Sequence, residues 1–460
     1  MRFNMGTGRG QARNMGARRQ FGLALATLIL LAGCGKFESP DTTSTDSQTN
    51  AAPQRAPLSD LMNFSTKFAA ASADESLAAD VGRNVLQAGG NATDAVVAMY
   101  FTMAVTLPSA AGLGASGACI AHNAKTLQAE SFVFAPQAAP GPIGGVSFMI
   151  PVGPRAVTLM HIRHGRLQWA QLLSPAERFA RGGFPVPRAL SRDLQVGATA
   201  LGADSEARRI YGKGSGTAVT EGDIWAQTDL AATIAVLRQR GGQDFFTGTF
   251  ARLLSTQIGS IGGNLPLDTL RNALAVAGPP VSENNGGYKV YVAPAPMAGA
   301  SALAGWNGRP APSTAVDNNS GGISGFAAVD TDGNAAACSL SMGQLFGTRI
   351  IVPGTGILLG ALTADSAAVS PVVIGNPNNG EFRFAGAGGG GPGAAYATGA
   401  VARAAIERGQ TVGAVLKARA GQGGYVNAIA CPDGIRSYGR TCNVGIDPAG
   451  SGLALVATGR

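Results

Sequence analysis

The segment from Asn318 to Asp332 constrains the fold and the chemistry of this chain more than any other. It reads NNSGGISGFAAVDTD: a glycine-rich approach, an alternating strand from Ile323, and a turn at Asp332 and Gly333. Enzymes that cut their own chain to free a strand's first residue as the nucleophile need this layout, with Thr, Ser or Cys at the cut. The segment therefore predicts where the chemistry lies, and the residue at the cut decides whether a nucleophile is present.

Composition limits the other functions. The chain has 460 residues, of which 45% are hydrophobic, 6% are aromatic and 67 are glycine, so a large core of small side chains is expected. The formal charge of +8 includes five arginines before Cys34, where there is no acid. The rest of the chain has 30 basic against 27 acidic residues, so nucleic acid is not an expected partner. These arginines are Arg2, Arg9, Arg13, Arg18 and Arg19.

Residues 1–33 are predicted to be an export signal. An arginine-rich head precedes the apolar run Phe21–Ala32, which is too short to span a membrane stably. The run ends in Leu31-Ala-Gly-Cys34, which resembles the lipobox of bacterial lipoproteins. This resemblance implies cleavage before Cys34 and lipidation of its thiol, whereas the alternative is a Cys that follows a signal peptide by chance. Arg18-Arg-Gln-Phe21 also resembles a twin-arginine export core, so the export route stays open.

The predicted location follows from this leader. The lipid on Cys34 would anchor the chain in the bacterial cell envelope, on the periplasmic side, with the membrane as its partner. Residue 35 is Gly rather than Asp, which favours the outer membrane in a Gram-negative organism. Residues 34–57 are rich in Ser, Thr, Asp, Gln and Pro and are predicted to be a disordered tether, so the folded body is expected from Leu58.

The remaining cysteines fall into two pairs. Cys431 and Cys442 flank a polar loop, so a local disulfide is expected in an oxidising compartment. Cys119 and Cys338 lie in apolar surroundings and are predicted to be buried thiols. The chain has three histidines and no Cys/His spacing of the zinc type, so no metal site is expected.

Two helices are expected near the start of the folded body. Apolar residues recur at four-residue intervals from Asp74, Gly89 stops the first helix, and Asn91 is a good N-cap for the second. The whole run from Ser76 to Gly117, SLAADVGRNVLQAGGNATDAVVAMYFTMAVTLPSAAGLGASG, resembles the N-terminal signature of the γ-glutamyltranspeptidase family. Further resemblance follows in the family's order, at residues 161–186, 227–248, 287–300, 325–348, 354–360, 369–374 and 445–454.

This resemblance implies an α+β fold, the N-terminal-nucleophile hydrolase αββα sandwich, with two stacked antiparallel sheets and helices outside. Residues 58–320 would correspond to the large subunit and residues 321–460 to the small subunit, intertwined in one globular body. The alternating strands expected near Phe326, Ala337 and Val372 agree with such a sandwich. The stretch between Ala300 and Ile323 is much shorter than the family's.

The family's nucleophile is the first Thr of a Thr-Thr-His run, and alignment on Phe326 puts Ile323 at that position. Isoleucine has no hydroxyl with which to attack. Ser324 is the alternative nucleophile after a one-residue shift, although neighbouring strand side chains face opposite ways. Ser320 lies earlier, in the loop, and also faces the wrong way. The family's second Thr, which supports the nucleophile, maps to Ser341.

Substrate-binding positions are altered in the same way. The family's carboxylate-clamping Arg maps to Pro136, and a bidentate clamp needs a guanidinium. The family's Gln and Asp map to Leu362 and Asp365, so only the acid is retained. Its Asn maps to Gly343, and its paired serines map to Ala367 and Ala368.

The glycine run Gly386–Gly391 aligns with the family's oxyanion loop, in which Gly389 and Gly390 would stabilise the tetrahedral intermediate through their N–H groups. The run also fits a dinucleotide-binding G-x-G-x-x-G pattern, but no parallel βαβ unit follows it. No cofactor is therefore expected.

Two functions remain. The first is a degenerate family member in the cell envelope, without γ-glutamyl transfer or self-cleavage and with a binding or structural role. The second is an active glutathione hydrolase or γ-glutamyltransferase-like amidohydrolase with a shifted Ser nucleophile and an altered substrate. Because Ile323 stands at the nucleophile position, enzyme activity is left open, as are a small-molecule or peptide ligand and the oligomeric state.

Overall fold

The computed structural model describes residues 67–311, 321–420, 422–436 and 440–458, all within the compact unit Ser59–Arg460. The predicted signal peptide (1–33), the lipidated Cys34 with its tether (34–57) and Ser320 lie outside the described residues. None of the described helices is both long and apolar enough to cross a lipid bilayer.

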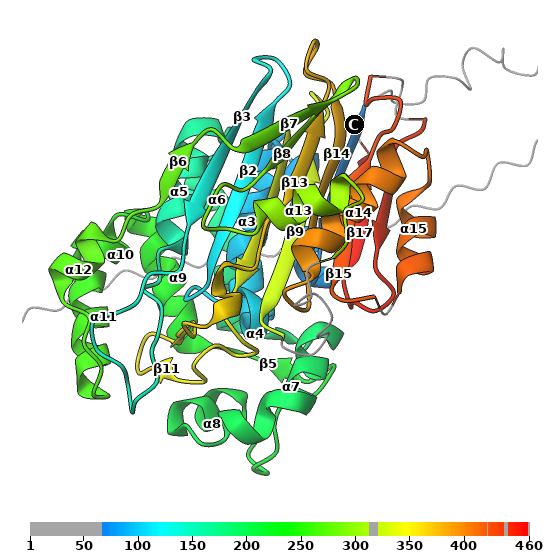
Figure 1. Cartoon of the computed structure of the whole chain (residues 1–460). Helices are drawn as coiled ribbons and strands as arrows, with labels where there is room; N and C mark the ends of the chain where they lie inside the picture. Colours follow the sequence, from blue (N-terminus) through cyan, green and yellow to red (C-terminus); the bar gives the residue numbers. More distant parts are fainter. Residues whose placement is uncertain (1–66, 312–320, 421, 437–439, 459–460) are drawn as a thin grey trace, which may run out of the picture. The chain divides into compact units, whose positions relative to one another are not determined.

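Two antiparallel sheets form the centre of the fold (Figure 1). The first has seven strands, in the order β17 (Leu453–Thr458), β1 (Phe68–Ala73), β9 (Ile323–Val329), β10 (Ala335–Ser341), β2 (Ser116–Asn123), β3 (Gln128–Phe134) and β6 (Val276–Gly278). The second has six, in the order β16 (Asn443–Ile446), β15 (Tyr425–Ala430), β14 (Phe382–Gly389), β13 (Val372–Gly375), β8 (Tyr288–Val292) and β7 (Val281–Asn285). Strands from both ends of the chain are therefore neighbours in the first sheet, where β1 lies between β17 and β9 and β10 pairs with β2.

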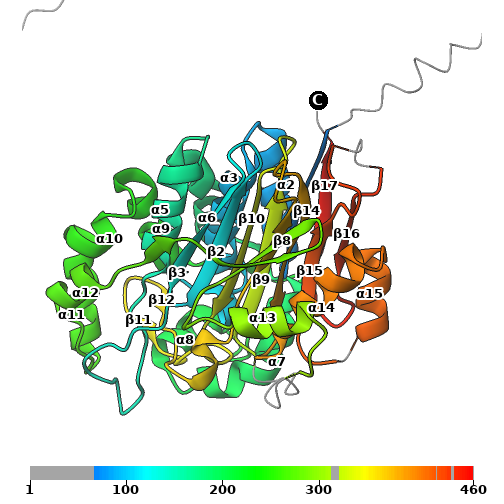
Figure 2. The ribbon, with the colours of Figure 1, turned by 45° about the horizontal axis from the view of Figure 1, so that its top comes forward.

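Helices cover the outer faces of the two sheets (Figures 1 and 2). Those on the first sheet include α2 (Ser76–Gln87), α3 (Ala92–Thr106), α5 (Gly153–His164), α6 (Trp169–Gly182) and α9 (Thr228–Arg240). Those on the second are α13 (Gly299–Trp306), α14 (Ala394–Ile406) and α15 (Val412–Arg419). The others are α4 (Pro108–Ala111), α7 (Arg188–Leu201), α8 (Ser205–Tyr211), α10 (Asp244–Thr247), α11 (Thr249–Ser260), α12 (Leu267–Asn272) and the 3-10 turn η2 (Ala364–Ala367). Two small ribbons pair β4 (Phe184–Pro185) with β5 (Ile224–Trp225) and β11 (Ile351–Val352) with β12 (Ile357–Leu358).

Strand β9 is buried on both faces because it lies between a helical layer and the second sheet. Phe326 and Ala328 join the core under the helices, whereas Ala327 and Val329 join the core between the sheets. This alternation follows from the two-residue period of a strand. The strand predicted around Phe326 is therefore confirmed, together with its turn, in which the Gly333 N–H donates to the Asp330 carbonyl at 3.0 Å.

The two N-terminal helices are confirmed by their caps. The Glu75 carboxylate accepts from the first N–H groups of α2, and Gly89 follows the helix with φ 88°. The Asn91 side chain accepts from the Asp94 N–H, and the Asp94 side chain accepts from the Asn91 N–H. This reciprocal capping satisfies N–H groups that no helical carbonyl can reach. Every residue of α3 is buried, so its cap fixes a central element of the fold.

The prediction of free buried thiols at Cys119 and Cys338 is wrong. The two residues are direct partners in the β2–β10 register and are joined in a disulfide, with their Cα atoms 4.1 Å apart. Both are fully buried. The disulfide therefore links two central strands of the first sheet across 219 residues of sequence.

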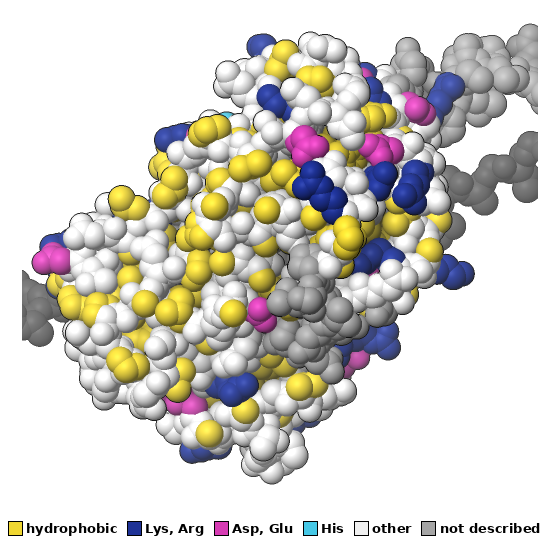
Figure 3. Space-filling view, in the orientation of Figure 1, with side chains coloured by type: hydrophobic (Ala, Val, Ile, Leu, Met, Phe, Trp, Pro, Cys, Tyr) yellow, Lys and Arg dark blue, Asp and Glu magenta, His cyan; other side chains and the backbone are white. Residues whose placement is uncertain are grey.

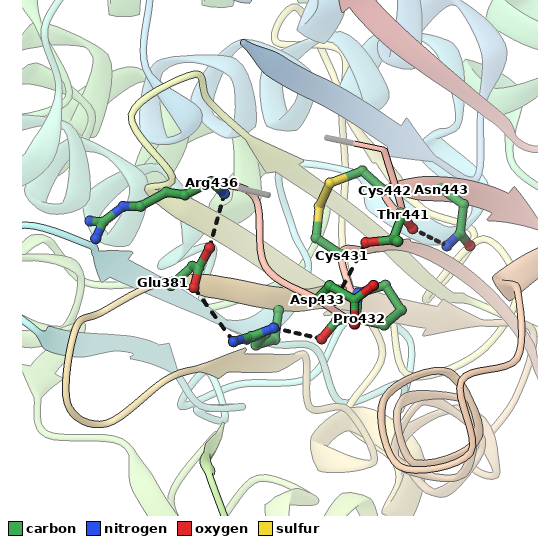
Figure 4. Close-up of a disulfide and its surroundings, with 9 residues drawn as sticks. Glu381, Cys431, Pro432, Asp433, Arg436, Thr441, Cys442 and Asn443 are labelled. Atoms are coloured by element: carbon green, nitrogen blue, oxygen red, sulfur yellow. Dashed lines mark hydrogen bonds and ion pairs between the residues drawn. A yellow bond between two sulfur atoms is a disulfide. The ribbon is translucent and has the colours of Figure 1, made fainter. Parts of the chain in front are cut away.

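A second disulfide joins Cys431 and Cys442, the local pairing expected from the sequence (Figure 4). The Glu381 carboxylate beside it accepts from the Arg436 N–H at 2.9 Å. The Asp433 N–H donates to the Thr441 Oγ1 at 3.4 Å. On the molecular face in Figure 3, basic and acidic side chains lie among uncharged and apolar ones.

We expect the central disulfide to contribute more stability than the local one. In the chain-entropy account, a disulfide raises the free energy of the unfolded chain because it removes conformational entropy. Closing 219 residues raises it by about 5 kcal/mol, and closing 11 residues raises it by about 3 kcal/mol. The double variant Cys119→Ala/Cys338→Ala should therefore unfold at a lower urea concentration than Cys431→Ala/Cys442→Ala. Equal denaturation midpoints for the wild type and the first variant would contradict a formed central disulfide.

Candidate functional site

The site lies where β9 begins. Ile323, its first residue, is 1% exposed, and its carbonyl accepts the Gly390 N–H at 2.9 Å. The side chain packs in a small apolar cluster with Ala118, Val369 and Ala394. Ile323 is therefore an apolar packing residue.

A cavity of about 230 Å³ lies beside Ile323. Several lining residues are glycines because the backbone there runs close to neighbouring chain: a Cβ on Gly322, whose φ is 75°, would lie 2.3 Å from the Gln344 carbonyl carbon. The other described lining residues combine a single Arg-Asp pair with apolar side chains. The lining consists of Ala110, Arg192, Asp193, Val196, Gly321, Gly322, Ile323, Leu345, Gly390, Gly424, Tyr425 and Ala449.

Ser324, the alternative nucleophile, does not line this cavity. It is fully buried, and its Oγ donates to the Asp74 Oδ2 at 3.0 Å. The Gly325 N–H donates to the same oxygen at 2.7 Å, and the Asn427 side-chain amide donates to Oδ1. The Ser324 hydroxyl is thus held inside the protein, away from the cavity wall.

Burial raises the pKa of Asp74 to about 7. The hydrogen bonds from Gly325, Ser324 and Asn427 and the charge of Arg192 oppose this rise, because each of them favours the carboxylate. The carboxyl group is therefore poised to change its protonation state near neutral pH.

Ser341 and Asp365 meet, but outside the cavity. The Ser341 Oγ donates to the Asp365 carbonyl at 3.0 Å and accepts the Gly343 N–H at 3.0 Å. Ser341 is also the β10 partner of Ile323 in the register. These contacts attach η2 to the end of the central strand β10, which gives Ser341 a supporting position.

The two loop glycines lie directly against the start of β9. A Cβ on Gly389 would lie 2.3 Å from the Asp74 Oδ2, so only glycine fits there. Gly390 lines the cavity, but its N–H is engaged by the Ile323 carbonyl. Strand β14, which leads into this loop, is antiparallel to both of its neighbours, so the parallel unit of a dinucleotide site is absent from this described sheet.

Sequence reasoning missed the charged wall of the cavity. The Arg192 Nε and Nη2 donate to the Asp193 Oδ1 at 3.2 and 3.1 Å, and the Ser109 Oγ donates to Asp193 Oδ2 at 2.6 Å. The Arg192 Cζ lies 5.6 Å from the Tyr425 ring centroid. An Arg-Asp pair on an amphipathic helix was the available signal. Pro136 is not among the lining residues.

The charges in this wall influence one another. Burial raises the pKa of Asp193, and the neighbouring Arg192 lowers it. Burial also works against the charge on Arg192, but Tyr425 and Asp193 raise its pKa above the ordinary value. Arg192 is therefore a permanent cation beside Ile323. No group of three His, Cys, Asp or Glu side chains suited to a metal ion occurs in the described part of the chain.

Comparison with known proteins identifies the family. The sequence profile described as Gamma-glutamyltranspeptidase matches residues 78–308, half of the chain. The chain belongs to the γ-glutamyltranspeptidase family. The family resemblance predicted from the sequence is thereby confirmed.

Relatives match in part of their length. The glutathione hydrolase proenzymes of Bacillus subtilis (strain 168) and Escherichia coli (strain K12) are each 28% identical, over 243 and 254 residues. The aligned part covers 48% and 49% of this chain, but 41% and 42% of the relatives. The chain thus aligns with less than half the length of these relatives.

The fold extends further than the sequence match. The crystal structure of cephalosporin acylase from Bacillus halodurans is similar with a TM-score of 0.69 and 17% identity, covering 90% of this chain and 99% of that one. At this identity the likeness concerns the fold alone. The predicted N-terminal-nucleophile hydrolase αββα sandwich is confirmed.

Asp74 should give the γ-glutamyltranspeptidase-family fold a measurable pH dependence. Its pKa is about 7 when folded and near 3.8 when unfolded, so the folded state holds the proton more tightly. The stability that the protonated Asp74 adds to the folded state is fully present below pH 3.8 and is lost as the pH rises to 7. From pH 5 to 8, we expect the free energy of unfolding of the wild type to fall by about 3 kcal/mol relative to Asp74→Asn.

Urea denaturation at several pH values measures this difference. The comparison with Asp74→Asn is needed because burial also raises the pKa of Glu75, Asp193 and Asp330. Asp332→Asn, which removes an exposed carboxylate, is the control for the loss of one acidic side chain. If the free energies of unfolding of the wild type and Asp74→Asn change equally with pH, the pKa of Asp74 is not raised in the folded state.

Proposed function

We propose that this chain is a γ-glutamyltranspeptidase-family protein that neither cuts itself nor transfers γ-glutamyl groups, and that its cavity binds a small ligand. The observation that carries the proposal is Ile323, which stands at the family's nucleophile position beside the cavity and has a buried, apolar side chain in place of a hydroxyl. Covalent catalysis of this kind needs a hydroxyl or thiol at that point.

The cavity lining supports the proposal. None of its described residues is Ser, Thr, Cys, His or Lys. Tyr425 has the one hydroxyl group, and burial raises the pKa of its phenol far above neutrality. Pro136 and Gly343 replace the family's Arg and Asn, so an α-carboxylate loses its partners there. These replacements remove both the group needed for nucleophilic attack and the groups needed to bind the substrate.

A second candidate function rests on one observation. The Ser324 hydroxyl donates to Asp74, whose pKa lies near 7, and a carboxylate of that pKa is suited to act as a general base at neutral pH. A shifted active site would use this pair for hydrolysis of an amide. It requires that β9 move so that Ser324, now buried, reaches the substrate.

The two candidates differ in the fate of the chain. If the chain is inactive, a denaturing gel and mass spectrometry should give one polypeptide that continues through Ile323, and γ-glutamyl-p-nitroanilide should release no nitroaniline. Ile323→Thr should remain inactive towards this substrate, because the carboxylate clamp is still missing. A new N-terminus at Ser320 or Ser324, with activity lost in Ser324→Ala, would establish the active alternative instead.

We further propose that the protein is exported and held in the cell envelope by a lipid on Cys34. The leader sequence motivates this location, and the two disulfides in the folded body support it because disulfides persist in oxidising compartments.

Membrane fractionation tests the anchor. We expect the wild type to sediment with membranes and Cys34→Ala to appear in the soluble fraction, since the variant cannot carry the lipid. Cys431→Ala/Cys442→Ala is the control for loss of other cysteines and should stay with the membrane. Equal membrane retention of Cys34→Ala would refute lipid anchoring through this residue.

A further inference from the structure

We infer that the cavity beside Ile323 binds a small monocarboxylic acid with an uncharged, apolar body, and that Arg192 receives the carboxylate. This inference rests on the proposed function, in which the cavity binds a ligand without reacting with it. Three features of the cavity support it: the cation in the wall, the apolar surface around it, and a single carboxylate that is already paired.

The cation in the lining is more exposed than its counterion. The side chain of Arg192 is 35% exposed, whereas that of Asp193 is 9% exposed. A guanidinium has five N–H donors. Asp193 accepts from Nε and Nη2, Ser451 accepts from Nη1 at 3.4 Å, and Tyr425 provides a further contact. At least one donor is left for an incoming carboxylate, which pairs well with Arg in planar geometry.

The rest of the lining fits a short apolar body. Leu345 and the buried Ile323 are branched apolar residues of the lining, and Val196 lies one helical turn beyond Arg192 with 71% of its surface exposed. The volume of about 230 Å³ is below that of typical drug-sized sites. The cavity therefore suits a compact acid such as a short acyl chain.

The same wall disfavours an amino-acid head group. An ammonium group needs acceptors, and Asp193 is the single carboxylate among the described lining residues. Its oxygens already accept from Arg192 and Ser109, and little of the side chain is exposed. The preferred ligand is thus an acid that carries no ammonium group, in contrast to a γ-glutamyl compound.

Calorimetric titration of the full chain tests this inference without any variant. Hexanoate and hexanamide have nearly the same shape and differ in charge. We expect hexanoate to bind about tenfold more tightly or better, because a charge-assisted bond to Arg192 replaces a neutral one. L-Glutamate should bind more weakly than hexanoate. Equal affinities for hexanoate and hexanamide, no binding of either, or tighter binding of L-glutamate would overturn the inference.

Variants at Val196 locate the site without disturbing the core, since this residue is exposed. Val196→Glu puts a carboxylate one turn from Arg192, where it should pair with the guanidinium and repel the ligand, weakening hexanoate about tenfold. Val196→Gln has the size of Val196→Glu without the charge and should weaken binding less than Val196→Glu does. If both variants bind hexanoate like the wild type, the acid binds elsewhere and the inference fails.

Arg192→Gln gives a direct test of the cation. It should lose the preference for hexanoate over hexanamide, provided that circular dichroism shows a folded chain, and a folded variant that keeps the preference would refute the role of Arg192. Arg188→Gln, on the same helix but outside the lining, is the matched control. Self-cleavage on a gel would refute the proposed function, whereas an intact chain that ignores hexanoate would refute this inference alone.

Discussion

The buried carboxyl group of Asp74 joins the two sheets at the point where the candidate site is built. Asp74 follows β1 and accepts from Ser324 and Gly325 on β9, all at one end of the first sheet. It also accepts from Asn427 on β15, in the second sheet. A buried polar group is costly unless it is paired, so these hydrogen bonds fix the spacing between the sheets. The position of Ile323 follows from that spacing, because Ile323 directly precedes Ser324 on β9.

Close approach of the sheets requires small residues. A Cβ on Gly325 would lie 2.6 Å from the Ala387 Cβ, and one on Gly389 would collide with the Asp74 carboxylate. The abundance of Gly and Ala in the chain thus has a structural cause at this site. Since close packing leaves few voids, larger side chains there would force the sheets apart and break the Asp74 hydrogen bonds.

The sequence predicted elements whose signals are local. Asn91 and Asp94 are three residues apart, so their reciprocal cap could be recognised without knowledge of the fold. Strand β9 was predicted from its alternation and its Asp-Gly turn. The disulfide between Cys119 and Cys338 was missed because it depends on the exact register of β10 against β2, which the sequence does not display. Arg192 and Tyr425 were missed for a similar reason, since α7 and β15 meet only in the folded chain.

An apolar residue at the start of β9 alters the electrostatics of the cavity as well as its chemistry. Ile323 is one of the lining residues, and the lining includes several other apolar residues. Fewer polar groups lower the local dielectric, which strengthens the attraction between Arg192 and a carboxylate. The same low dielectric disfavours any second charge that lacks a partner. An isoleucine at this position therefore supports both proposals, a cavity that does not react with its ligand and a preference for a simple acid.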